Sequence, residues 1–88
     1  MRPLTIEVGH VRHVHGDGNL RAFVDVTIEN AFAIHGIRVV EGSKGLFVAM
    51  PSEKGRDGEY REIVHPVTKE AREELNRVVL AAVENGGK

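Results

Sequence analysis

The spacing of apolar residues changes once along this chain, and that change constrains the fold more than any other feature. Up to residue 64, apolar side chains recur mainly at every second position, as in strands that turn one face inward. From residue 68 onward they recur with helical spacing. The sequence therefore predicts a run of strands followed by one C-terminal helix, which is an α+β arrangement.

The most regular alternation covers residues 20–29. Apolar residues hold every second position there, and the intervening positions are polar except for Phe23. Residues 4–15 show a similar alternation, and the glycine-rich segment 16–19 between the two is typical of a tight turn. Together these segments predict a long β-hairpin.

Two glycines, Gly9 and Gly36, stand where the alternation changes phase, so each is expected to mark a β-bulge. The continuous apolar run over residues 46–50 predicts a strand that is covered on both faces. Residues 51–59 predict a polar loop, and residues 60–64 a short strand. The whole prediction is an antiparallel sheet of about five strands, arranged as a hairpin meander.

The helix is expected over residues 68–85, with Thr68 as its N-cap and Asn85-Gly86 as its stop signal. Its apolar residues form one stripe along the helix. One helix covers a five-stranded sheet poorly, and an open sheet edge invites pairing. We therefore expect a homodimer.

Length and composition place the chain among small single-domain proteins. Its 88 residues make one domain over residues 1–88, and the absence of cysteine excludes a disulfide framework and a thiolate zinc site. No apolar run approaches the ~20 residues of a membrane span. These features predict a cytoplasmic protein without a membrane partner.

Charge restricts the ways in which this chain can bind an acidic partner. Twelve basic residues face thirteen acidic ones, and neither half of the chain is strongly basic. A protein that holds nucleic acid by neutralising phosphates usually carries a basic stripe. Any such stripe here must arise from folding or dimerisation.

No residues form a recognisable catalytic constellation. His35 and His65 lie near strand turns without a nucleophile or an orienting carboxylate at a defined spacing, so we expect them to have structural roles. His10, His13 and His15 are numerous enough for a zinc ion, but strand geometry places them on different faces unless a bulge intervenes. We expect no catalytic residue, metal or cofactor, and we keep a histidine metal site as one alternative.

Two motifs resemble the SpoVG family of septation proteins. They are the run Gly45–Ser52 and the turn Asp57-Gly58-Glu59, within a resemblance that is strongest over residues 33–66 and extends over most of the chain. The resemblance implies a small bacterial protein that dimerises, binds DNA and in some members RNA, and is linked to septation, sporulation, cell division and gene regulation. It implies no enzymatic activity, no cofactor and no small-molecule substrate.

The resemblance also points to basic residues that would contact phosphates. The family tends to carry a Lys-Arg pair after the motif matching Met50-Pro51-Ser52, where this chain has Glu53-Lys54. The expected nucleic-acid-binding residues lie in this loop and on one flank of the helix: Lys54, Arg56, Arg61, Lys69 and Arg72. Their expected role is charge-assisted hydrogen bonding to phosphates, and the adjacent Tyr60 is able to stack on a base.

A second function remains open at this point. The chain could be a protein-interaction module of the division or septation machinery that does not bind nucleic acid. Its contact would then be the sheet edge or Leu80, an apolar residue on the otherwise polar side of the helix.

Overall fold

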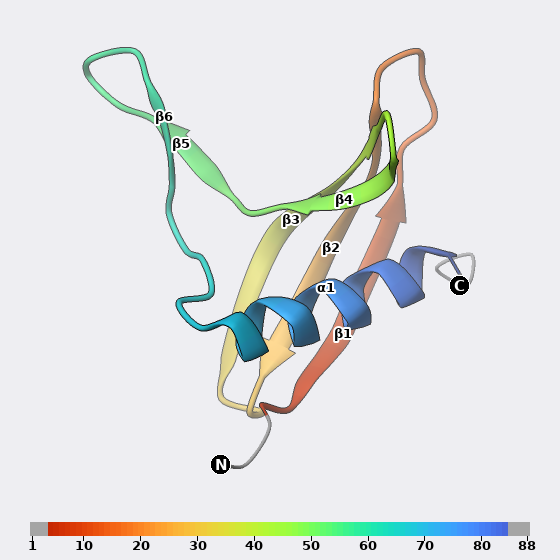
Figure 1. Ribbon diagram of the computed structural model, residues 1–88, viewed down its shortest axis with the longest axis vertical. Coiled ribbons are helices and arrows are strands. Elements are labelled where there is room, and N and C mark those ends of the chain that lie inside the picture. Colours follow the sequence, from red (N-terminus) through yellow and green to blue (C-terminus); the bar gives the residue numbers. More distant parts are fainter. Residues whose placement is uncertain (1–3, 85–88) are drawn as a thin grey trace.

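The computed structural model describes residues 4–84 of the chain. Six strands precede one helix within this range, and Figure 1 shows their arrangement. Their bounds are β1 Ile6–His13, β2 Leu20–Ile28, β3 Phe32–Gly42, β4 Gly45–Ala49, β5 Ser52–Lys54, β6 Tyr60–Glu62 and α1 Lys69–Glu84. The α+β class and the C-terminal helix predicted from the sequence are confirmed.

The strands form two separate sheets, which differs from the single sheet of about five strands expected. β1 to β4 form an antiparallel sheet in chain order, whereas β5 and β6 pair only with each other. The expected loop over residues 51–59 therefore contains a strand. The ribbon closes on itself because the carbonyl of Pro51 accepts from the N–H of Ile63, and that of Glu59 from the N–H of Gly55. In Figure 1 it extends away from the larger sheet.

The strand β4 is the outer strand of its sheet, and the prediction that its apolar run is covered on both faces is wrong. Phe47 in this strand is 50% exposed. The helix lies against one face only, so nothing in residues 4–84 shields the other face of β4.

Both predicted bulges are confirmed. The pairing of β1 with β2 shifts register between Val8 and His10, at Gly9. The pairing of β2 with β3 shifts between Val24 and Val26, and Gly36 on the opposing strand has a φ of 81°. This left-handed backbone conformation suits a residue without a Cβ.

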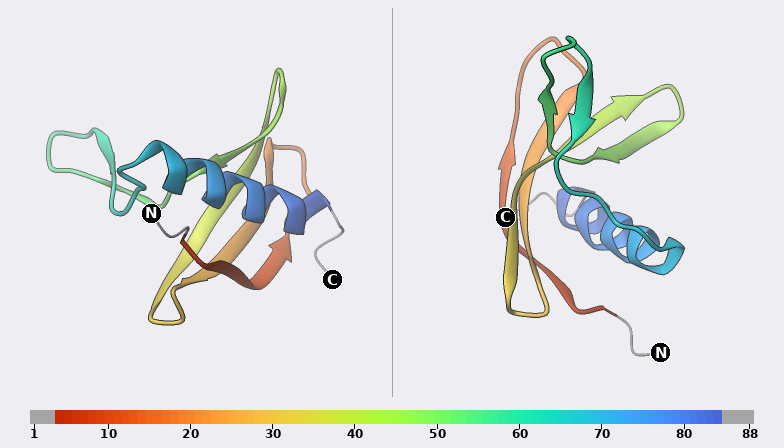
Figure 2. Two further views of the ribbon diagram at one scale, coloured as in Figure 1. Left: turned by 60° about the horizontal axis from the view of Figure 1, so that its bottom comes forward. Right: turned by 90° about the vertical axis from the view of Figure 1, so that its left-hand side faces the viewer.

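The helix α1 packs its apolar stripe across one face of the sheet (Figure 2). Thr68 caps it as expected, since its Oγ1 accepts from the N–H of Ala71 at 3.0 Å. The predicted stop at Asn85-Gly86 lies outside the described residues. The core between helix and sheet is formed by Ile6, Ala22, Val24, Val26, Ile37, Val39, Met50, Leu75, Val79 and Val83.

We predict that shortening Leu75 weakens this packing. Leu75 is 4% exposed, so Leu75→Ala leaves a cavity between helix and sheet and lowers the free energy of unfolding by about 2–4 kcal/mol. Val67 precedes the helix and is 83% exposed, so Val67→Ala changes the free energy by less than about 0.5 kcal/mol. Urea titration followed by circular dichroism measures both. Equal effects of the two changes would contradict the packing described here.

Candidate nucleic-acid interface

The small β5–β6 ribbon sorts its charged residues onto two faces. Lys54 lies opposite Tyr60, and Glu53 lies opposite Arg61. Directly opposed residues in an antiparallel pair share a face, and neighbours along a strand point to opposite faces. Glu53 therefore accompanies Arg61 and lies on the other side from Lys54. Glu53, which stands where the family tends to have a basic residue, therefore does not lie on the face that carries Lys54 and Tyr60.

Arg61 is held by a carboxylate within the ribbon. Its two terminal nitrogens donate to the two oxygens of Asp57, at 3.2 and 2.6 Å. This bidentate pairing, followed by a hydrogen bond from the N–H of Glu59, lowers the pKa of Asp57. Arg61 thus stabilises the turn of the ribbon, and its charge is largely compensated in the free protein.

Lys54 and Arg56 are exposed at the outer end of the ribbon. Neither forms an ion pair or a side-chain hydrogen bond within residues 4–84. Two cationic side chains without carboxylate partners therefore project from a protein whose formal net charge is −1. They are accessible to an anion in solution.

Lys69 and Arg72 lie in the first turn of α1 and are exposed as well. Neither has an ion pair in the described part of the chain. They belong to the helix, which covers one face of the main sheet, whereas Lys54, Arg56 and Arg61 belong to the ribbon. The structure thus places all three loop residues on the ribbon, with Arg61 on the other face from Lys54, and keeps the helix pair as a separate basic element.

The main sheet carries a row of residues on its uncovered face that sequence reasoning missed. Arg12 of β1 pairs with Phe23 of β2, and Phe23 pairs with Arg38 of β3. The guanidinium carbon of Arg12 lies 5.0 Å from the centre of the Phe23 ring, a cation–π distance. The available signal was Phe23 itself, the aromatic residue at an otherwise polar position of its strand.

This row adjoins the ribbon. Arg38 donates to Ser52 Oγ at 3.5 Å, a long hydrogen bond between β3 and β5. A shallow depression connects the two elements and is lined by Gly36, Arg38, Pro51, Ser52 and Tyr60. The uncovered sheet face and the ribbon therefore form one continuous surface.

Asp25 stands beside this row and supports the bulge of β3. Its carboxylate accepts from the N–H of Gly36 at 3.0 Å and lies 3.3 Å from Nδ1 of His35. The backbone hydrogen bond is the main reason why the pKa of Asp25 is lowered, and His35 lowers it further. Asp25 thus fixes the backbone at Gly36, which lines both shallow depressions of this face.

The histidines near the end of β1 do not converge. His10 pairs with Asp25, whereas His13 pairs with the fully buried Ala22, so His10 and His13 point to opposite faces. Among residues 4–84, no group of three or more histidines, cysteines or carboxylates is placed to hold a metal ion. The helix in this range is too short and polar to cross a membrane.

Comparison with known proteins gives a consistent family. The SpoVG family model matches residues 4–85. Proteins named "Putative septation protein SpoVG" from Lachnospira eligens and Heliobacterium modesticaldum are 50% and 51% identical to this chain. The matches cover 84% of both chains in the first case, and 90% of this chain and 89% of the relative in the second. A protein named "Putative septation protein SpoVG 2" from Listeria monocytogenes is 47% identical over 88% of this chain and 76% of its own.

We predict that Asp25→Asn lowers the free energy of unfolding by about 1 kcal/mol at neutral pH. The amide accepts the Gly36 hydrogen bond more weakly than the carboxylate does, and the loss is limited because a third of the side chain is exposed. Asp17 in the exposed turn provides the control, since Asp17→Asn should change stability by less than about 0.5 kcal/mol.

The same variant has a defined pH dependence. The pKa of Asp25 is lower in the folded state, so its contribution is complete above the pKa of a free aspartate, about 3.9, and is lost as the pH falls through the folded value. The difference between the wild type and Asp25→Asn in urea titrations should therefore shrink in acid. A difference that stays constant down to pH ~2 would contradict this role.

Proposed function

The chain belongs to the SpoVG family, and from that membership we propose that it is a cytoplasmic nucleic-acid-binding regulator connected with septation and sporulation. Its relatives are named for septation and not for a catalysed reaction. In this proposal the protein binds DNA or RNA through phosphates, regulates gene expression, and has neither enzymatic activity nor a cofactor.

The observation that carries the proposal is the pair of unpartnered cations on the ribbon. Lys54 and Arg56 are exposed, and no carboxylate in residues 4–84 pairs with them. Such side chains at the end of a projecting ribbon reach phosphate oxygens without first breaking an internal ion pair. Lys69 and Arg72 supply a second basic element at the start of the helix, where the helix dipole also favours an anion.

We further propose that the protein acts as a homodimer. The main sheet is open at its outer strands β1 and β4, and an outer strand presents unpaired backbone groups to a second chain. Phe32, Ile63 and Val67 are large apolar residues that are more than half exposed. A symmetric pair would present two copies of each basic element to one nucleic acid, which raises the effective affinity.

We predict that removal of the two ribbon cations weakens binding and its dependence on salt. In Lys54→Gln/Arg56→Gln, the slope of log affinity against log salt concentration on duplex DNA should become shallower by about 0.9 for each phosphate that the variant no longer neutralises. Fluorescence anisotropy with a labelled duplex, measured at several salt concentrations, gives both the affinity and the slope. Circular dichroism checks that the variant is folded.

The matched control is Lys44→Glu, which changes the net charge by the same two units. Lys44 lies in the exposed turn between β3 and β4, outside the proposed site. The Lys44→Glu variant should leave the slope of log affinity against log salt concentration unchanged if local contacts determine binding. An equal loss of affinity in both proteins would show that only net charge matters. A wild type that binds neither DNA nor RNA at low salt would overturn the proposal and favour the protein-interaction alternative.

The dimer is predicted separately. Sedimentation equilibrium at micromolar concentration should give twice the mass of the 9.7 kDa chain. Because the proposed contacts are apolar or backbone groups, this mass should persist at high salt, where binding to nucleic acid is lost. A single-chain mass over the whole concentration range would remove the dimer from the proposal.

A further inference from the structure

The uncovered face of the main sheet presents an aromatic ring between two cations. Arg12, Phe23 and Arg38 lie side by side on three neighbouring strands. With strands about 4.8 Å apart, the row spans roughly 10 Å. Helix α1 covers the opposite face of this sheet, as the edge-on view of Figure 2 shows.

The electrostatics of this row favour an anion. Neither Arg12 nor Arg38 forms an ion pair in the described residues. Asp25 is the carboxylate that lines the same depression as Arg12 and Phe23, and it already accepts from the Gly36 N–H and lies beside His35. The row therefore keeps two guanidinium groups whose charge no neighbouring carboxylate cancels.

We propose that this face is a stacking platform for the unpaired bases of single-stranded nucleic acid. The inference rests on the proposed function and adds a site and a ligand class to it. Bases stack on aromatic rings and on guanidinium planes, and both kinds of surface are present in this row. The two arginines also attract the phosphates that flank a stacked base.

A single strand fits this surface better than a duplex does. Bases in a duplex are already stacked on each other, and their edges are reached from within a groove. An open sheet face presents neither a helix nor a narrow projection at this row. An extended single strand, in contrast, turns its unpaired bases toward a platform while its backbone stays in solvent.

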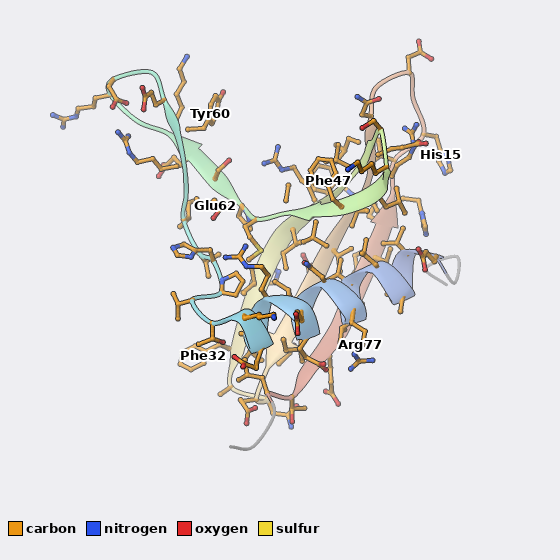
Figure 3. All side chains as sticks on the ribbon, in the orientation of Figure 1. His15, Phe32, Phe47, Tyr60, Glu62 and Arg77 are labelled. Atoms are coloured by element: carbon orange, nitrogen blue, oxygen red, sulfur yellow. The ribbon has the colours of Figure 1, made fainter. Side chains whose placement is uncertain are left out.

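Tyr60 extends the platform toward the ribbon. It is 70% exposed and lines the depression that contains Arg38. Figure 3 shows Tyr60 on the ribbon. Lys54 lies directly opposite Tyr60 on the same face of the ribbon. A strand that stacks on Phe23 and Tyr60 would therefore run toward the phosphate-binding cations of the ribbon.

A second copy of the chain is a poorer occupant of this face. A symmetric face-to-face contact would bring the arginines of one row against those of the other, and like charges removed from water repel strongly. A polyanion has the complementary charge. Charge complementarity therefore favours nucleic acid over a second copy of the chain as the occupant of this face.

The chain offers a built-in probe for the test. Tyr60 is its one tyrosine, and tryptophan is absent from the sequence. Tyrosine fluorescence thus reports on the surroundings of Tyr60 alone. The ligand is oligodeoxythymidylate of about 12 nucleotides, within the range of known single-strand sites, and its duplex with oligodeoxyadenylate is the comparison. We expect the single strand to quench Tyr60, after correction for absorbance, and the duplex to leave it nearly unchanged.

Variants then connect the signal to the row. Phe23→Leu and Arg38→Gln should each weaken single-strand binding by about tenfold, as expected when one stacking or cationic partner is removed, while duplex affinity stays the same. The control is Arg77→Gln, which changes an exposed arginine of helix α1 that is paired with Glu74 and lies away from Tyr60 in Figure 3. It should change neither affinity. If Phe23→Leu fails to fold, Arg38→Gln still decides.

The outcomes separate this inference from the proposed function. Single-strand binding without Tyr60 quenching, or full single-strand affinity in Arg38→Gln, overturns the platform and leaves the phosphate-binding proposal intact. Loss of single-strand binding in Phe23→Leu and Arg38→Gln, with unchanged affinity in Lys54→Gln/Arg56→Gln, supports the platform and removes the ribbon cations. A wild type that binds neither ligand overturns both.

Discussion

The packing of one helix against one face of the main sheet is the interaction on which the rest of the structure depends. Val79 of the helix and Ile37 of the sheet are fully buried by it, and the remainder of the apolar core lies between the same two layers. When only one face of a sheet is covered, the other face must carry side chains that are compatible with water. That requirement explains why Arg12, Asp25 and Arg38 occupy positions that a second covering layer would have made apolar. The same constraint leaves Phe23 accessible beside them.

The ribbon has a different physical basis. Its two strands have three residues each, and they are held by their own ladder and by the Arg61–Asp57 pair. They bury little apolar surface, so the ribbon contributes little to the core. Segments of this kind open at a lower free energy than core strands do, which allows the ribbon to adjust to a partner without cost to the main sheet. If a bound nucleic-acid backbone orders the ribbon, that ordering would reduce the net free energy of binding.

Local patterns predicted the elements that local physics controls. The hairpin, the bulges at Gly9 and Gly36 and the helix capped by Thr68 each follow from periodicity, a glycine or a capping side chain within a short window. The split into two sheets depends on which strand pairs with which, and no short window contains that information. The row of Arg12, Phe23 and Arg38 was missed for the same reason. A bulge shifts every later pairing by one residue, so Phe23 and Arg38 become neighbours only once the bulge at Gly36 is counted.

The site residues show the same division between composition and placement. A net charge of −1 argues against a nucleic-acid-binding protein when it is treated as a single number. The ribbon register separates Glu53 from Lys54 by placing them on opposite faces. Asp57 compensates Arg61, while Lys54 and Arg56 have no ion pair within residues 4–84. On the sheet, Asp25 is engaged by a backbone N–H and a histidine, so it does not compensate Arg12 or Arg38. Asp57 and Asp25 are thus engaged by other groups and do not neutralise these cations. Salt screens charges that lie more than about a Debye length apart, so a phosphate is attracted mainly by the charges close to it. The local distribution of charge, and not the net charge, therefore determines what the surface attracts.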